Sequence, residues 1–168
     1  MAITKIQSES LNLSDTYDFT GTVTGAGGTN TPAFHARGYG TQAVSANTWT
    51  KLTFATEEFD TNSAFASDRF TVPSGQDGKY LFTTGSTYNM DNGSGAQDIV
   101  IAIYKNGSSY NNYRLGSYDD TAQISNCTVS GIINLEAADY IEVYGFYDSG
   151  TNRSFYDTRF FHGHKILT

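Results

Sequence analysis

The chain has 168 residues, of which 17 are acidic and 10 basic, so its formal net charge is −7, and it has one cysteine. This length fits one domain with its own core, and the scarcity of Lys and Arg argues against a surface that binds nucleic acid or an anionic membrane. A single cysteine excludes a disulfide within the chain. Tyr, Phe and Gly number 12, 11 and 17. Aromatic residues fit the pleated surface of a sheet and glycine fits tight turns, so we expect a β protein with very little helix.

The first segment, residues 1–31, is polar and rich in Thr and Gly. It lacks the apolar stretch of a secretory signal, and no apolar run in the chain approaches the roughly 18 residues of a membrane span. Its glycines and the Pro32 that follows predict an extended arm, with the globular head in residues 32–168. The arm has few apolar side chains, and we expect these to anchor it in an assembly: Leu11, Leu13, Tyr17, Phe19 and Val23.

Short stretches that alternate apolar and polar residues follow Pro32 and predict strands separated by turns. They are residues 33–39, 48–55, 68–73 and 79–89. Residues 99–103 are apolar at successive positions, which indicates a strand buried on both faces. The pair Asn106-Gly107 comes shortly after it and accepts the positive φ angles of a type I′ hairpin turn.

Two further strands are predicted in residues 125–150, with a break from Glu136 to Asp139. Alternation in the first of them makes Cys127 a small buried strand residue. The last strand, within residues 153–168, carries two adjacent Phe and an Ile and should lie inside a sheet. Eight to ten strands without a helix predict an antiparallel jelly-roll sandwich.

Residues 52–82, LTFATEEFDTNSAFASDRFTVPSGQDGKYLF, resemble the globular head of complement C1q and its tumour-necrosis-factor-like relatives. The residues that match the pattern of that family are Phe59, Asn62, Phe70, Thr71, Pro73, Gly78, Tyr80 and Phe82. Three further segments match in the same order: 99–107, 129–146 and 158–166, with Ala138 in place of the usual glycine. The resemblance implies a jelly roll of about ten strands that assembles as a homotrimer and binds through its loops, without catalysis. The collagen stalk of the animal proteins is absent, because the chain has no Gly-X-Y period.

The opening residues 1–28 resemble the start of many tail-fibre and other virion proteins of tailed bacteriophages, in which short modules of this composition precede varied heads. The resemblance implies a virion structural protein, a trimeric fibre or decoration protein made in the host cytoplasm. Residues 1–31 would attach it to other virion proteins of the capsid or tail, and the head would be displayed outward to bind a host-surface protein or glycan. The alternative is a soluble bacterial binding module, a C1q-like or lectin-like trimer.

No catalytic motif is apparent: the chain has no G-x-S-x-G turn, phosphate-binding loop or paired cysteines. The adjacent pairs Glu57-Glu58 and Asp119-Asp120 would point to opposite faces of a strand and so do not form an acid–base pair. We therefore expect no enzyme activity and no organic cofactor.

The sequence His162-Gly163-His164 is the sharpest chemical feature. Residues two apart in a strand share a face, so both imidazoles could bind one metal ion, and three chains around an axis would offer six nitrogens. The alternative is that these histidines fill polar space between strands or at the seam of the trimer. Alternation favours the alternative: if Phe161, Gly163 and Lys165 face the threefold axis, the two histidines face away from it.

Two predicted loops, residues 106–120 and 147–157, combine Tyr with Asn, Asp and Arg, which is typical of surfaces that recognise carbohydrates or proteins. The candidate recognition residues are Tyr110, Asn112, Tyr113, Arg114, Tyr118, Tyr147 and Arg153. The alternative is that half of the aromatic ones pack in the sandwich or in trimer contacts. Calcium at Asp91, Asp98, Asp119 and Asp120 has less support, because no D-x-D-x-D-G run occurs.

Overall fold

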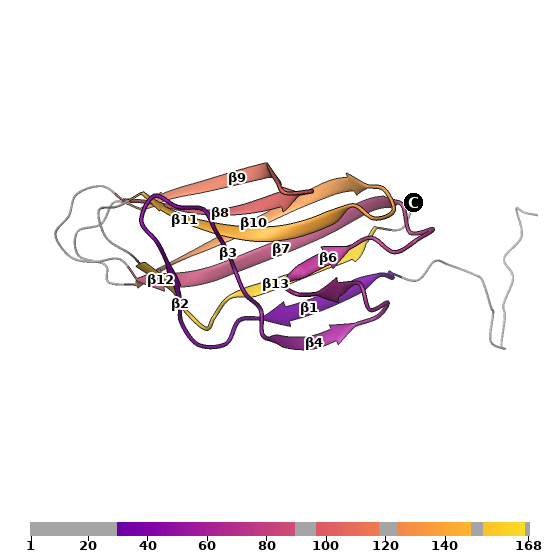
Figure 1. Ribbon diagram of the computed structural model, residues 1–168, viewed down its shortest axis with the longest axis horizontal. Helices are drawn as coiled ribbons and strands as arrows, with labels where there is room; N and C mark the ends of the chain where they lie inside the picture. The colour runs from indigo at the N-terminus through magenta and orange to yellow at the C-terminus, as the bar shows by residue number, and fades with distance from the viewer. Residues whose placement is uncertain (1–29, 90–96, 118–123, 149–152, 167–168) are drawn as a thin grey trace, which may run out of the picture.

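The computed structural model describes residues 30–89, 97–117, 124–148 and 153–166. All regular structure within these ranges is β-strand, arranged in two antiparallel sheets that stack on each other (Figure 1). The described part of the chain accordingly offers no helix with the length and apolarity to cross a bilayer. The predicted all-β sandwich is confirmed.

The seven-stranded sheet has the order β2-β12-β7-β13-β1-β4, and β10 pairs with β7 outside this path. Its strands are β1 (Ala33–Arg37), β2 (Gln42–Val44), β4 (Thr56–Asp60), β7 (Gly78–Asn89), β10 (Ile124–Leu135), β12 (Arg153–Phe155) and β13 (Phe160–Lys165). The closing strand β13 lies between β7 and β1, inside the sheet as predicted.

The six-stranded sheet has the order β5-β6-β11-β8-β9, and β3 pairs with β11. Its strands are β3 (Thr50–Lys51), β5 (Phe65–Ala66), β6 (Arg69–Thr71), β8 (Gln97–Lys105), β9 (Ser108–Ser117) and β11 (Tyr140–Asp148). Asn106 and Gly107 have φ angles of 51° and 77° and form the predicted hairpin between β8 and β9. The described strands outnumber the expected ten because several are pieces of two or three residues that pair only briefly with longer neighbours.

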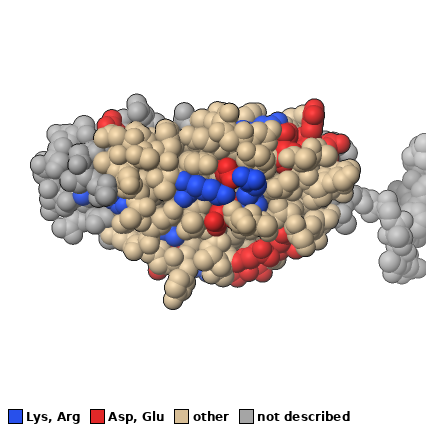
Figure 2. Space-filling model, in the orientation of Figure 1, with Lys and Arg blue, Asp and Glu red and all other residues tan. Residues whose placement is uncertain are grey.

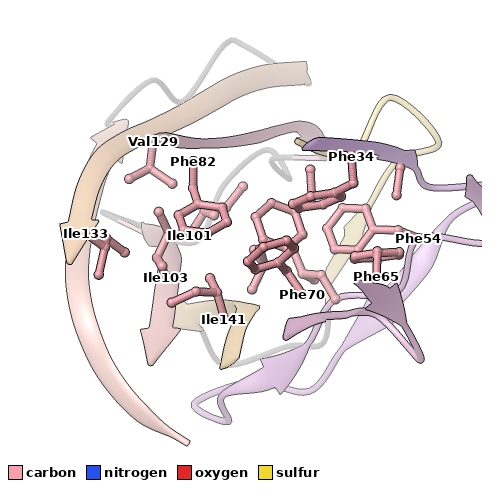
Figure 3. Packing of buried hydrophobic residues seen from close by; sticks show 14 of the residues in the cluster. Phe34, Phe54, Phe65, Phe70, Phe82, Ile101, Ile103, Val129, Ile133 and Ile141 are labelled. Carbon is pink, nitrogen blue, oxygen red and sulfur yellow. The ribbon is translucent and has the colours of Figure 1, made fainter. Parts of the chain in front are cut away.

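Aromatic and aliphatic side chains divide the core between the sheets (Figure 3). Phe34 stacks on Phe65 and Phe70, with ring centroids 4.9 Å and 5.1 Å apart, and lies edge-on to Phe161 at 4.9 Å. Figure 3 places Ile101, Ile103, Val129, Ile133 and Ile141 together at the other end, and Phe82 between the two groups. Every residue from Ile99 to Ile103 is buried, as the unbroken apolar run predicted.

Two small residues fit the core closely. A Cβ on Gly163 would come within 2.4 Å of the Phe82 ring, so only glycine lets β13 approach β7 here. Cys127 is buried in β10 as predicted, and desolvation raises the pKa of its thiol to about 12. The thiol is therefore protonated near neutral pH and acts as a small apolar group.

Candidate functional site

The candidate site lies on the outer side of the seven-stranded sheet. Successive residues of a strand point to opposite faces. In β1 and β13, Phe34 and Phe161 point into the core, so their neighbours His35, His162 and His164 point outward. The three histidines of the chain therefore share one face of one sheet.

Strand register arranges this face in two rows. The first row runs across four neighbouring strand pairs in the order Phe59, His35, His162, Thr83 and Ser130. The second row runs in the order Ala33, His164, Leu81 and Ile132. Neither row contains Lys, Arg, Asp or Glu, although the chain has 27 such residues (10 + 17). We call these nine residues, together with Phe160, the histidine face.

Ring contacts connect the first row. The His35 ring lies 5.4 Å from the His162 ring at an angle of 87° and 6.2 Å from the Phe59 ring. The Phe160 ring stacks on His162 at 5.4 Å and 19°. Gly85 makes room for it, because a Cβ at that position would lie 2.9 Å from the Phe160 ring. The imidazoles are therefore held by aromatic neighbours.

The histidine face is open to solvent in the single chain. Ile132 is 61% exposed and Phe59 is 50% exposed. A pocket of about 310 Å³ opens on the same face, and its lining includes all three histidines and Phe59. Large apolar side chains left exposed in rows without charged residues are typical of surfaces that another protein covers.

His162 is biased toward its neutral form. Burial lowers its pKa below the ordinary value, and the neighbouring charges that His35 and His164 can carry lower it further. Near neutral pH the centre of the face is therefore uncharged, and its burial against a partner does not require the desolvation of an ion.

Metal binding at His162 and His164 stays a prediction. The two histidines do share a face. The argument against a metal assumed that Phe161 and Gly163 face the threefold axis, but both face the core of the sandwich. Within the described residues no group of three or more His, Cys, Asp or Glu is placed to hold a metal ion. A site on this face would need further ligands, from a second chain or from residues outside those that the structure describes.

The prediction that Tyr147 is a surface recognition residue is wrong. Its side chain is fully buried, with its ring 5.3 Å from that of Phe155 and 6.3 Å from that of Tyr88. Its hydroxyl donates a hydrogen bond to the carbonyl of Ser154 at 3.2 Å, and desolvation strongly raises its pKa. The reason is the strand period: β11 continues to Asp148, and its odd-numbered residues point into the core.

The other recognition candidates have mixed outcomes. Tyr110 is exposed on β9, and Arg153 is half-buried on β12. Asn112, Tyr113 and Arg114 were predicted to lie in a loop, but they lie within strand β9. The remaining candidates lie outside the described residues: Tyr118, the arm residues Leu11, Leu13, Tyr17, Phe19 and Val23, and the acidic residues Asp91, Asp119 and Asp120.

Comparison with known proteins finds relatives by structure only. No protein-family model matches the chain, and no curated protein matches it by sequence. Among solved structures, the globular domain of zebrafish complement 1qA superposes with a TM-score of 0.57 at 16% identity, covering 81% of this chain and 97% of its own. Eiger TNF from S. frugiperda superposes with a TM-score of 0.52 at 16% identity, covering 80% of this chain and 92% of its own. Murine APRIL superposes with a TM-score of 0.55 at 13% identity, covering 80% of this chain and 98% of its own.

These neighbours share a fold with the chain. The superposition includes nearly the whole length of each neighbour. The chain has the jelly-roll fold of C1q and TNF globular domains, as the sequence resemblance implied. Identities of 13 to 16% show the fold alone. The resemblance of residues 1–28 to phage proteins lies outside what these comparisons test.

Proposed function

We propose that this chain is a non-enzymatic binding module that assembles as a homotrimer through the histidine face. The observation that carries the proposal is a sheet face whose two central rows have no charged residue and expose Ile132 and Phe59. Burying such side chains against a second copy removes apolar area from water at about 25 cal/mol per Å². The resemblance to C1q and TNF globular domains supports three copies.

The finer proposal is a bacteriophage virion component. Residues 1–31 attach the protein to other virion proteins of the capsid or tail, and the jelly roll is displayed outward. A polar Thr- and Gly-rich segment followed by a complete jelly-roll head supports this arrangement. An extended segment of low apolarity gains order by docking on partners. The alternative is a soluble bacterial module of the same fold.

The molar mass of the purified chain tests the assembly. Sedimentation equilibrium at micromolar concentration is expected to give three times the chain mass of 18.3 kDa. A stable species of one chain mass contradicts the trimer.

Particle composition tests the finer proposal. If the protein is a virion component, mass spectrometry of purified particles detects it, and deletion of residues 1–31 removes it from particles while the head still assembles. Absence of the chain from particles made by cells that express it supports the soluble module instead.

A further inference from the structure

The outer side of the six-stranded sheet carries a connected set of aromatic rings. The ring centroids of Phe146 and Trp49 are 5.0 Å apart, and those of Trp49 and Tyr104 are 5.8 Å apart. The ring of Tyr104 stacks on that of Tyr144, with centroids 4.1 Å apart and an interplanar angle of 30°. None of these four residues belongs to the core cluster between the sheets. Trp49 is 37% exposed, and the other three are half-buried.

Two small apolar residues of β8 lie next to these rings in the same sheet. Strand register places Val100 opposite Phe146 and Ala102 opposite Tyr144, on the side of β8 that faces away from the core. Val100 and Ala102 are buried although neither belongs to the core cluster. The rings therefore lie beside buried apolar residues of the neighbouring strand, and the ring contacts among them limit their orientation.

Two cations lie beside the rings, held by one hidden carboxylate. Glu142 is 3% exposed, and its Oε1 accepts hydrogen bonds from Nζ of Lys51 at 2.7 Å and from Nε and Nη2 of Arg69 at 2.9 Å and 2.8 Å. The Arg69 guanidinium also lies 3.9 Å from the centre of the Tyr140 ring. Within the described part of the chain, Nη1 of Arg69 makes no hydrogen bond.

Lys51, Arg69 and Glu142 together form a locally positive site on an acidic protein. Lys51 and Arg69 keep partly exposed side chains while Glu142 is covered, so the group presents a net charge of +1 on a chain of net charge −7. Figure 2 shows basic side chains in a short row near the middle of one broad face, with acidic side chains beside them and uncharged surface around them. We call the four rings, Tyr140, Lys51, Arg69 and Glu142 the tyrosine face.

We propose that the tyrosine face binds an acidic saccharide, a sugar that carries a carboxylate or a sulfate group. The C–H face of a pyranose ring packs on aromatic rings such as Trp49 and Tyr104, whose polar edges remain wet. A planar guanidinium fixed by one carboxylate offers its remaining nitrogen to the acid group of the sugar, and Lys51 adds a second positive charge.

Charge decides between this ligand and two others. A neutral sugar would use the rings alone, whereas an acid group would also contact Nη1 of Arg69, which the pairing with Glu142 leaves without a hydrogen bond among the described residues. A nucleic acid requires several phosphate contacts, and two cations shared with one carboxylate supply too few of them. The inference names a ligand for the proposed binding module and rests on that function, but it requires one chain only and does not depend on the trimer.

The experiment exploits the single tryptophan of the chain. Trp49 fluorescence of the full chain is titrated with two matched pairs of probes: sialyllactose against lactose, and trigalacturonic acid against its methyl ester. At least one acidic sugar is expected to change the fluorescence, with an affinity about tenfold above that of its neutral counterpart. No response to either acidic sugar, equal affinity for both members of each pair, or a response only to a single-stranded oligonucleotide overturns the proposal.

Two variants locate the binding by calorimetry. Trp49→Ala is expected to weaken binding of the acidic sugar about tenfold, and Arg69→Gln is expected to reduce its affinity to that of the neutral sugar. The matched controls Tyr39→Ala, an aromatic residue 82% exposed elsewhere, and Arg37→Gln, an exposed arginine, should bind as the wild type does. Undiminished binding by both site variants overturns the site.

A further variant separates this inference from the proposed assembly. Ile132→Glu alters only the histidine face. If this variant is monomeric and still binds the acidic sugar, the result supports the tyrosine face as the binding site and leaves only the copy number in question. A wild-type trimer that ignores all four sugars overturns the inference and leaves the assembly standing.

Discussion

On the outer side of the seven-stranded sheet, the two central rows contain no charged side chain, whereas the six-stranded sheet places Lys51, Arg69 and Glu142 beside its outward aromatic rings. Both sheets contribute their inner faces to the same core, so the requirements of folding act on them alike. Their outer faces differ, and each suits a different contact. An apolar face whose central rows lack charge suits burial against a second copy. A face with fixed cations suits a small charged ligand, because the edges of such a face stay hydrated when the ligand is bound.

The largest expected effect comes from placing a charge on the histidine face. Ile132→Glu should convert the assembled protein to single chains, because a buried carboxylate without a partner costs several kcal/mol at each contact. Folding should be unaffected, since Ile132 is 61% exposed in the single chain. Sedimentation equilibrium measures the change, with circular dichroism as the check on folding.

The matched control for this variant is on the other sheet. Thr71 is exposed on β6, opposite Tyr140, so Thr71→Glu adds the same charge to the outer side of the six-stranded sheet. It should leave the molar mass unchanged. If Thr71→Glu dissociates the assembly and Ile132→Glu does not, the roles of the two faces are reversed.

Much of the core was predictable from the sequence because its signals are local. The unbroken apolar run of β8, the Asn106-Gly107 turn and the buried Cys127 each depend on a few neighbouring residues, and all three are confirmed. The count of strands was less predictable. Pieces as short as β3 and β5 exist only because longer strands lie beside them, which no local pattern records.

The candidate site was harder to predict because it depends on strand register. His35 lies opposite His162, and Leu81 lies opposite Ile132, but each pair joins distant parts of the sequence. Alternation indicated that His162 and His164 share a face and could not indicate what lies beside them. Tyr147 was misassigned for a related reason: the Asp-Ser-Gly that follows it is typical of a loop, and only the length of β11 shows that Tyr147 still belongs to the strand.

An intermediate effect is expected from the buried carboxylate of the tyrosine face. Burial alone would raise the pKa of Glu142, but the hydrogen bonds and charges of Lys51 and Arg69 outweigh it and hold the pKa below its ordinary value. Glu142→Gln keeps the shape and removes the charge, so it should lower the free energy of unfolding by about 2 kcal/mol. Urea denaturation measures the loss.

The comparison pair for Glu142 lies at the edge of the other sheet. Arg37 and Glu58 are both exposed, and their closest nitrogen and oxygen are 3.4 Å apart. Solvent screens such a pair, so Glu58→Gln should change the free energy of unfolding by less than about 0.5 kcal/mol. Equal losses in the two variants would mean that Glu142 is not held more strongly than a surface residue.

The smallest effect expected is a dependence on pH that belongs to the histidine face alone. Because the pKa of His162 is lowered in the fold, chiefly by burial and then by the neighbouring His35 and His164, the unfolded chain takes up a proton first as the pH falls below about 6.5. The contribution of His162 to stability is therefore complete above pH 6.5 and is lost as the pH falls through its folded pKa.

The monomeric Ile132→Glu chain isolates this effect from assembly. Across the sheet from His162 and His164, the neighbours on β7 are Thr83 and Leu81, which do not titrate. The titratable groups beside His162 are His35 on the adjoining strand β1 and His164 two residues along β13, and Arg37 on β1 adds a permanent charge opposite Phe160. The thermal midpoint of that chain should fall between pH 7.5 and pH 5.5, and His162→Gln in the same background should reduce the fall. Glu142 stays ionised throughout this range because its pKa is lowered, so the tyrosine face contributes nothing to the difference. A fall of the same size in the His162→Gln chain would assign the pH dependence to groups other than His162 and remove this distinction between the two faces.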